Sequence, residues 1–152
     1  SYLWNTFDFA VPMWKRGGVP ARNLKGLVTF DRKIKKDSYF WYKANWSKEP
    51  VLYLTQRRNV NREKKETTVT VYSNIGTPKV YLNGKELTGI RKGYTDVHYV
   101  FDKVTLESGK NILKATVSSG GKEYTDEIEW MYNGEMKREA DFYENKKEHA
   151  GW

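Results

Sequence analysis

The chain has 152 residues, which is enough for one ordinary domain with an appendage. Its 30% charged residues and mean hydropathy of −0.83 argue against a membrane span, and the absence of cysteine excludes disulfides, thiolate metal sites and cysteine nucleophiles. The net charge of +8 comes almost entirely from residues 1–48, where ten Lys and Arg stand against three Asp. Residues 49–152 are nearly balanced, so we expect neither a nucleic-acid partner nor a membrane partner.

The first 48 residues contain short elements that do not make a domain by themselves. The segment "YLWNTF" (2–7) is typical of a strand, and "KRGGVPARN" (15–23) is typical of a loop. The segment "GLVTFD" (26–31) indicates a turn that leads into a short strand. We expect these pieces to depend on contacts with other parts of a protein.

The segment "KKDSYFWYKANW" (35–46) has two interpretations. Its four consecutive aromatic residues favour a strand. The spacing of Tyr39, Tyr42 and Trp46 equally permits a short helix that is capped by Asp37. The residue pattern does not decide between them.

From about residue 50 the pattern is that of an all-β fold. Stretches rich in β-branched and aromatic residues recur between turn signals, at 51–56, 67–74, 79–87, 98–106, 112–118 and 122–132. Asn83-Gly84 predicts a type I′ hairpin turn, because both of its residues tolerate positive φ. The pattern predicts a two-sheet antiparallel sandwich of immunoglobulin-like size.

The residue patterns of three further segments predict a strand, a loop and a tail. Strict alternation over 98–106 places Tyr99, Phe101 and Lys103 on one face of a strand. The charged stretch 57–66 is expected to be a solvated loop between the first two strands. The tail 133–152 has only a sparse apolar stripe and is interpreted as a linker or a frayed helix.

Three stretches of the sequence resemble a known family. "WNTFDF" (4–9), "NLKGLVTFDRKIKKDSYFWYKANW" (23–46) and "EPVLYL" (49–54) closely resemble the end of the catalytic domain of family 2 glycoside hydrolases, which include β-galactosidases, β-glucuronidases and β-mannosidases. The resemblance continues more weakly through the β-rich part. It implies that the chain is a C-terminal part of such an enzyme and starts inside a barrel strand.

The resemblance also implies a domain organisation. Residues 1–48 would be the last strand and helix of a TIM barrel, which makes 35–46 a helix. Residues 49–132 would be an immunoglobulin-like β-sandwich, and 133–152 a linker or tail. The expected fold class is therefore mainly β, with an antiparallel sandwich preceded by the end of a barrel. The rest of the barrel and further sandwich domains would be partners supplied by the parent enzyme.

The resemblance implies a substrate-binding role for three residues. Trp4 corresponds to a tryptophan that forms an apolar wall under the sugar, a task that suits a flat indole ring. Asn23 and Lys25 resemble the Asn-x-Lys of β-glucuronidases, whose side chains hold the sugar carboxylate. Galactosidase-like members carry similar loops, and "GLVTFDRK…YKANW" resembles those members more closely, so a structural or general loop role is favoured over recognition of a carboxylate. Asp8 and Asp31 are expected to bond to nearby loops or basic residues rather than to act in catalysis.

No catalytic residue is expected in this chain. Retaining glycosidases use two carboxyl groups, and the resemblance places both glutamates upstream of Ser1. Every Glu here lies at position 49 or later. We also expect no metal site and no cofactor, since the chain has only two His and no ligand cluster. A periplasmic or secreted parent enzyme is compatible with the sequence, which does not select a location.

Two functions follow from these observations. The first is that the chain is part of a retaining β-glycosidase, of the β-galactosidase type, in which the sandwich is a structural accessory and the substrate is a β-linked sugar. The second is a carbohydrate-binding sandwich without catalysis. In that case five aromatic residues would form an exposed row, instead of filling the core: Tyr53, Tyr72, Tyr81, Tyr99 and Trp130.

Overall fold

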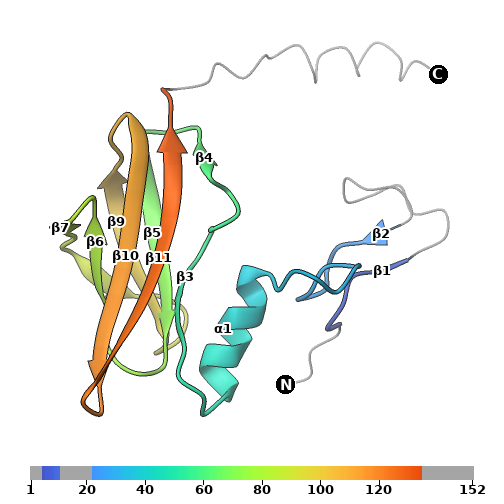
Figure 1. Cartoon of the computed structure of the whole chain (residues 1–152). Coiled ribbons are helices and arrows are strands. Elements are labelled where there is room, and N and C mark those ends of the chain that lie inside the picture. The colour runs from blue at the N-terminus through green and yellow to red at the C-terminus, as the bar shows by residue number, and fades with distance from the viewer. Residues whose placement is uncertain (1–4, 11–21, 135–152) are drawn as a thin grey trace, which may run out of the picture.

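Two β-sheets packed face to face make up most of the part of the chain that the computed structural model describes, residues 5–10 and 22–134 (Figure 1). The five-stranded sheet has the order β4-β11-β10-β6-β7, with bounds Asn61–Arg62, Lys122–Tyr132, Gly109–Ser119, Lys79–Leu82 and Lys85–Glu86. The four-stranded sheet has the order β3-β5-β9-β8, with bounds Leu52–Leu54, Glu66–Ser73, His98–Thr105 and Ile90–Lys92. Except for β4, which runs parallel to β11, the strand pairs of these two sheets are antiparallel. The prediction of a mainly β, antiparallel sandwich is confirmed.

The core between the sheets follows the alternation of the strands. In β10 every second residue from Asn111 to Val117 is buried, whereas Ile112 and Lys114 between them face solvent. Each large apolar side chain removed from water in this way contributes about 1.5–3 kcal/mol. The core cluster draws on both sheets: Leu54, Val69, Val71, Val80, Tyr99, Phe101, Val104, Leu106, Leu113, Ala115, Ile128, Trp130 and Tyr132.

The tight hairpin predicted at Asn83-Gly84 is present. It joins β6 to β7, and its two residues have φ of 50° and 82°. Positive φ at both positions is the signature of a type I′ turn, whose twist matches that of the flanking strands. The local chemistry of the turn therefore sets the register of this hairpin.

The strict alternation predicted for 98–106 is wrong at Lys103. This residue has a φ of 53° and is exposed, and the register with β5 shifts between Thr67 and Val69. A β-bulge inserts one extra residue, so that the next side chain returns to the inner face. Val104 is accordingly buried in the core, where the alternation alone would have placed Lys103.

The segment 35–46 forms helix α1 (Asp37–Trp46), as the family resemblance implied. Its start differs from the prediction: Lys36 occupies the N-cap position without a side-chain cap, and Asp37 is the first helical residue. Trp46 at the other end is 58% exposed. The carboxylate of Asp37 is therefore available for a different contact.

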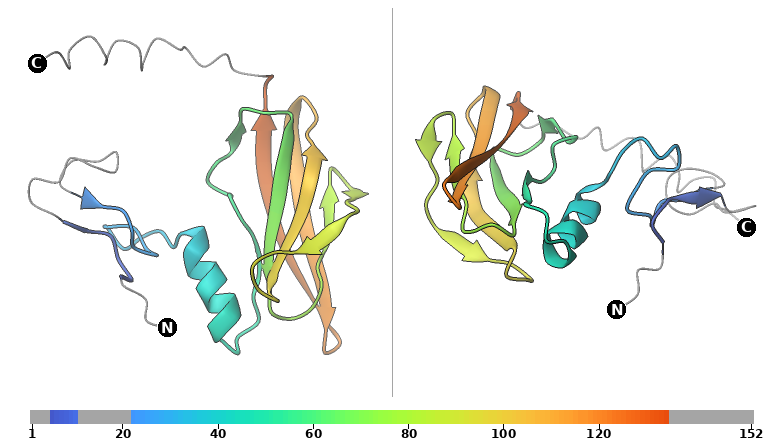
Figure 2. Two further views of the ribbon diagram at one scale, coloured as in Figure 1. Left: turned by 180° about the vertical axis from the view of Figure 1, so that it is seen from behind. Right: turned by 60° about the horizontal axis from the view of Figure 1, so that its bottom comes forward.

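Helix α1 packs against the sandwich beside β3, as two views show (Figures 1 and 2). Phe40 stacks on Tyr53 with ring centroids 3.9 Å apart, and Ala44 is buried together with Val51. The packed stripe thus consists of Phe40 and Ala44, which lie next to the more exposed stripe that ends at Trp46. A short helix of this kind depends on tertiary packing for its stability.

The carboxylate of Asp37 connects the start of α1 to the sandwich. It accepts hydrogen bonds from the Tyr53 hydroxyl at 2.6 Å and from the backbone N–H of Gln56 at 2.7 Å. Burial of the phenol, and then its hydrogen bond to Asp37, raise the pKa of Tyr53. The phenol therefore remains protonated and able to donate.

Asp37→Ala is expected to loosen α1 while the sandwich stays folded. The change leaves the Tyr53 hydroxyl and the Gln56 N–H without their acceptor, at a cost of about 1–3 kcal/mol. Hydrogen exchange of the α1 amides should become faster, and exchange in β10 and β11 should not change. Ser38→Ala, at an exposed position in the same helical turn, is the control; equal protection of α1 in both variants would contradict this role of Asp37.

Asp126 on β11 joins the two sheets at their open edge. Its carboxylate accepts hydrogen bonds from the backbone N–H of Leu54 at 2.7 Å and from Arg57 at 2.5 Å. The Arg57 guanidinium also lies 4.2 Å from the ring centre of Tyr53. A charged side chain thus satisfies a backbone donor of β3 that would otherwise be unpaired at a sheet edge.

The N-terminal part forms a small unit on the side of α1 away from the sandwich (Figure 1). Strands β1 (Phe9–Ala10) and β2 (Arg22–Asn23) pair antiparallel, with Phe9 opposite Asn23. Val28 forms isolated bridges to Phe7 and to Lys35. Residues 26–28 therefore run alongside residues 6–8.

In the part that the structure describes, no helix has the length and apolarity to cross a bilayer.

Candidate functional site

Asn23 and Lys25 lie on one tight turn at the end of β2. The backbone N–H of Lys25 donates to the Asn23 side-chain oxygen at 3.0 Å. This is an Asx turn, in which an asparagine oxygen binds the N–H two residues later. Because the amide oxygen is used inside the turn, the amide NH₂ is the group of Asn23 that can donate to a ligand.

The chemistry of this turn suits a carboxylate. Lys25 is exposed, and the side chains of Asn23 and Lys25 leave the same turn. An amide donor and an ammonium group can both donate to one carboxylate, and the bond from the ammonium is charge-assisted. The structure therefore places two of the three predicted substrate-binding residues on one turn. Trp4, the third, lies outside the described residues.

Asp8 lies directly behind this turn and is buried. Its carboxylate accepts from the Gly26 N–H at 2.9 Å and from the Lys36 ammonium at 2.7 Å. Asp31 accepts from the Thr29 hydroxyl at 2.5 Å, and this bond lowers the pKa of Asp31. As predicted, both aspartates bond to nearby loops or basic residues: Asp8 to a loop and to Lys36, and Asp31 to its own loop. The sequence gives no signal for the role of Lys36, because its neighbours do not distinguish it from the other lysines.

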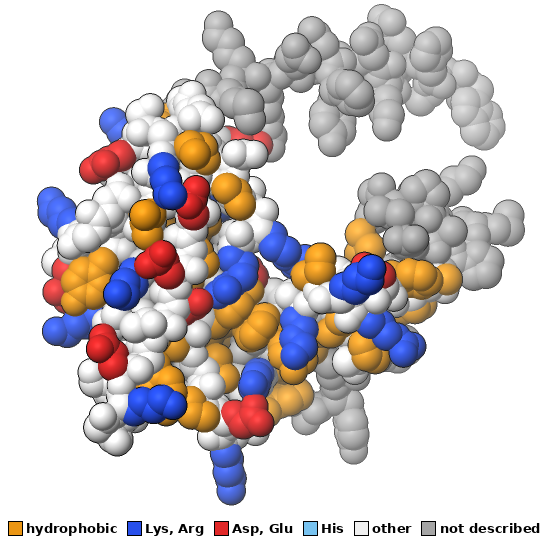
Figure 3. All heavy atoms as spheres, viewed as in Figure 1, with side chains coloured by type: hydrophobic (Ala, Val, Ile, Leu, Met, Phe, Trp, Pro, Cys, Tyr) orange, Lys and Arg blue, Asp and Glu red, His pale blue; other side chains and the backbone are white. Residues whose placement is uncertain are grey.

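Large apolar side chains are exposed on α1 and on the N-terminal unit. Figure 3 shows hydrophobic side chains on the surface of α1 and of the β1–β2 unit. Five residues there are each at least 40% exposed: Phe7, Leu24, Phe30, Ile34 and Trp46. A patch of this kind marks a surface that other protein normally covers.

Five aromatic residues of the sandwich do not form the exposed row that a sugar-binding platform needs. Tyr53, Tyr99 and Trp130 are buried, and Tyr72 and Tyr81 are half-buried. Tyr53 lies between Phe40 and Tyr72 under α1, with stacked rings on both sides. The observed arrangement favours the core interpretation of these residues.

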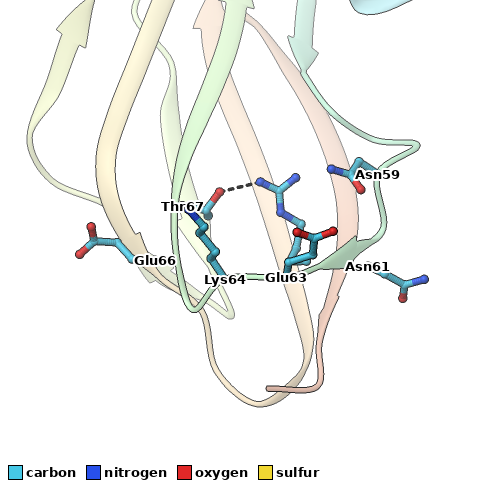
Figure 4. Close-up of a pocket in the computed structure, with 7 residues that line it drawn as sticks. Asn59, Asn61, Glu63, Lys64, Glu66 and Thr67 are labelled. Atoms are coloured by element: carbon cyan, nitrogen blue, oxygen red, sulfur yellow. Dashed lines mark hydrogen bonds between the residues drawn. The ribbon is translucent and has the colours of Figure 1, made fainter. Parts of the chain in front are cut away.

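A polar pocket of about 260 Å³ lies in the stretch that was expected to be a solvated loop (Figure 4). Its lining includes Arg62 of β4, which donates to Thr67 at 2.6 Å and to Gln56 at 2.5 Å. The same guanidinium lies 4.2 Å from the ring centre of Trp130, and burial lowers its pKa. Arg62 thus covers a core tryptophan, which the charge pattern of 57–66 did not indicate.

The described residues hold no metal-binding group of three or more His, Cys, Asp and Glu side chains. Among them, His98 is buried, and its Nδ1 accepts the backbone N–H of Tyr94 at 3.1 Å. The glutamates in this part of the chain all lie at or beyond Glu49. Their position is on the sandwich or on the connection that leads to it.

No protein-family model matches the chain. A curated "Beta-glucuronidase" of Bacteroides fragilis is 39% identical over 133 residues, which are 87% of this chain and 19% of that protein. A "Putative beta-glucuronidase" of Formosa agariphila is 31% identical and covers 93% of this chain and 19% of its own length. The chain therefore spans about a fifth of the length of these two curated relatives.

Two solved structures are likewise matched over only about a fifth of their own length. A crystal structure of a "putative beta-galactosidase" from Bacteroides fragilis is 81% identical, with a TM-score of 0.87 over 92% of this chain and 21% of that one. A crystal structure of an "FMN-binding beta-glucuronidase" from Facaelibacterium prausnitzii is 41% identical, with a TM-score of 0.72 over 88% of this chain and 19% of that one. Both proteins are several times longer than the chain.

Proposed function

Because this chain is a C-terminal part of a family 2 glycoside hydrolase of the β-glucuronidase and β-galactosidase type, we propose that the full-length protein cleaves β-linked sugars with retention of configuration. The two catalytic glutamates belong to the part of the enzyme outside this chain. Residues 1–48 contribute the last strand and helix of a TIM barrel, at the end of which such active sites lie. The sandwich of residues 49–132 is a structural accessory, and the linker or tail expected at 133–152 lies, from residue 135 on, outside the described residues.

The substrate that we propose is a β-D-glucuronide. The observation that carries this choice is the 3.0 Å hydrogen bond that makes Asn23, Leu24 and Lys25 one Asx turn. The turn presents an amide NH₂ and an ammonium group, which complement the carboxylate of a glucuronide. The curated relatives named above are also β-glucuronidases by name. A galactoside has no carboxylate for this pair to bind.

A β-galactosidase, the function first expected from the sequence, is the second candidate. It is favoured by the name of the crystal structure that is 81% identical to this chain. In that case the Asn23-Leu24-Lys25 turn is a general loop. Trp4 has the same proposed role with either substrate, as an apolar wall under the sugar ring.

Turnover of two matched substrates tests the choice. The full-length enzyme is assayed with nitrophenyl β-D-glucuronide and nitrophenyl β-D-galactoside at equal concentration. We expect kcat/KM to be higher for the glucuronide. Faster hydrolysis of the galactoside would favour the second candidate, and hydrolysis of neither would overturn the proposed activity.

A further inference from the structure

The turn that carries Asn23 and Lys25 is supported by a partly buried ion pair between Asp8 and Lys36. The side chain of Asp8 is 3% exposed, and the Lys36 ammonium lies 2.7 Å from its carboxylate. A carboxylate buried to this extent normally has a charged partner, because an isolated buried charge is very unfavourable. Neither Asp8 nor Lys36 is used in the proposed binding of substrate.

Asp8 and Lys36 each bind one backbone group of the turn. The Asp8 carboxylate accepts the N–H of Gly26 at 2.9 Å, and the Lys36 ammonium donates to the carbonyl of Leu24 at 2.9 Å. These two groups lie immediately before and after Lys25. The backbone of Lys25 is therefore fixed on both sides, and its side chain is left to reach a ligand.

Gly26 lets the turn approach this support closely. A Cβ atom at this position would lie 2.1 Å from the carbonyl carbon of Phe7 and 2.2 Å from the nitrogen of Asp8. Only glycine allows two backbones to come so near. The backbone N–H groups of Leu27 and Val28 continue the contact, since both donate to the Thr6 carbonyl, at 3.0 and 2.9 Å.

We propose that Asp8 and Lys36 are positioning residues that set the place of the Asn23-Leu24-Lys25 turn and thereby the preference for a carboxylate-bearing sugar. This inference rests on the proposed β-glucuronidase function. The ion pair also neutralises the Lys36 charge behind the turn, so that Lys25 is the cation that the turn offers to the substrate. Misplacement of a binding group by about 1 Å can lower the rate by about 100-fold, so the support matters as much as the contact.

The test uses the full-length enzyme with the changes Asp8→Asn and Lys36→Met. We expect KM for nitrophenyl β-D-glucuronide to rise by about 10-fold or more, with a smaller change in kcat, because the lost contact serves binding. Lys36→Arg keeps a cationic donor and should restore much of the loss. Asp31→Asn changes an exposed carboxylate of the adjacent turn and should leave KM unchanged.

A double-mutant cycle with Lys25→Met separates positioning from general stability. If Lys36 acts through the turn, Lys36→Met should add little to the KM of a Lys25→Met enzyme. Full additivity, or an unchanged glucuronide KM in both single variants, would overturn the positioning role. Absence of glucuronide hydrolysis by the unaltered enzyme would instead overturn the proposed function, and this inference with it. Should a variant fail to fold, the Lys36→Arg enzyme and its KM decide the question.

Discussion

Lys25→Met in the full-length enzyme is expected to lower kcat/KM for nitrophenyl β-D-glucuronide by about 10- to 150-fold, the equivalent of one hydrogen bond to a charged group. The methionine side chain preserves much of the apolar stem of lysine but removes the ammonium group. The carboxylate of the substrate then enters the site without its cation. The Asx turn itself should persist, because the bond to the Asn23 side chain comes from the backbone N–H of residue 25.

Hydrolysis of the galactoside provides the internal comparison. This sugar has no carboxylate, so the same variant should show little change in kcat/KM with it. Lys33→Met removes a lysine from the exposed turn nearby and is the matched control. An equal loss of kcat/KM with both substrates would mean that Lys25 supports the structure of the site and does not bind the carboxylate.

Trp130→Ala is expected to lower the free energy of unfolding by about 3–5 kcal/mol, as is typical when a large aromatic side chain is removed from a core. Trp130 is 1% exposed and belongs to the core cluster of the sandwich. Its indole N–H donates to the carbonyl of Gln56 at 3.3 Å, and Arg62 covers its ring at 4.2 Å. The substitution therefore removes a packing element, a hydrogen bond and a cation–π contact together.

Urea unfolding followed by circular dichroism measures this loss, which is a large share of the roughly 5–15 kcal/mol that stabilises a typical domain. Tyr94→Ala is the control, since this aromatic side chain is 91% exposed. Substitutions at exposed positions away from special features usually change stability by less than about 0.5 kcal/mol. Equal unfolding midpoints for the two variants would show that Trp130 is not a main contributor to the core.

The candidate site was indicated by the sequence through the resemblance of Asn23-Leu24-Lys25 to the Asn-x-Lys of β-glucuronidases. Asn23 and Lys25 stand two positions apart, and that spacing alone permits an Asx turn. The support behind the turn was not predictable in the same way. Asp8 and Lys36 are 28 residues apart, and only the folded chain shows that they form an ion pair. The bridge of Val28 to Phe7, between residues far apart in the sequence, and the shorter-range bridge of Val28 to Lys35 bring the two segments together.

The sequence by itself determined the features of the fold that local chemistry controls. The strand periodicity predicted the sandwich, and Asn83-Gly84 predicted its hairpin turn, because a period of two and a tolerance of positive φ are properties of neighbouring residues. Tertiary structure decided the rest. The aromatic run in 35–46 is a helix because Phe40 and Ala44 pack on Tyr53 and Val51, although β-propensity favours a strand there. Propensities of this kind amount to about 1 kcal/mol or less per residue, so burial against a distant strand outweighs them.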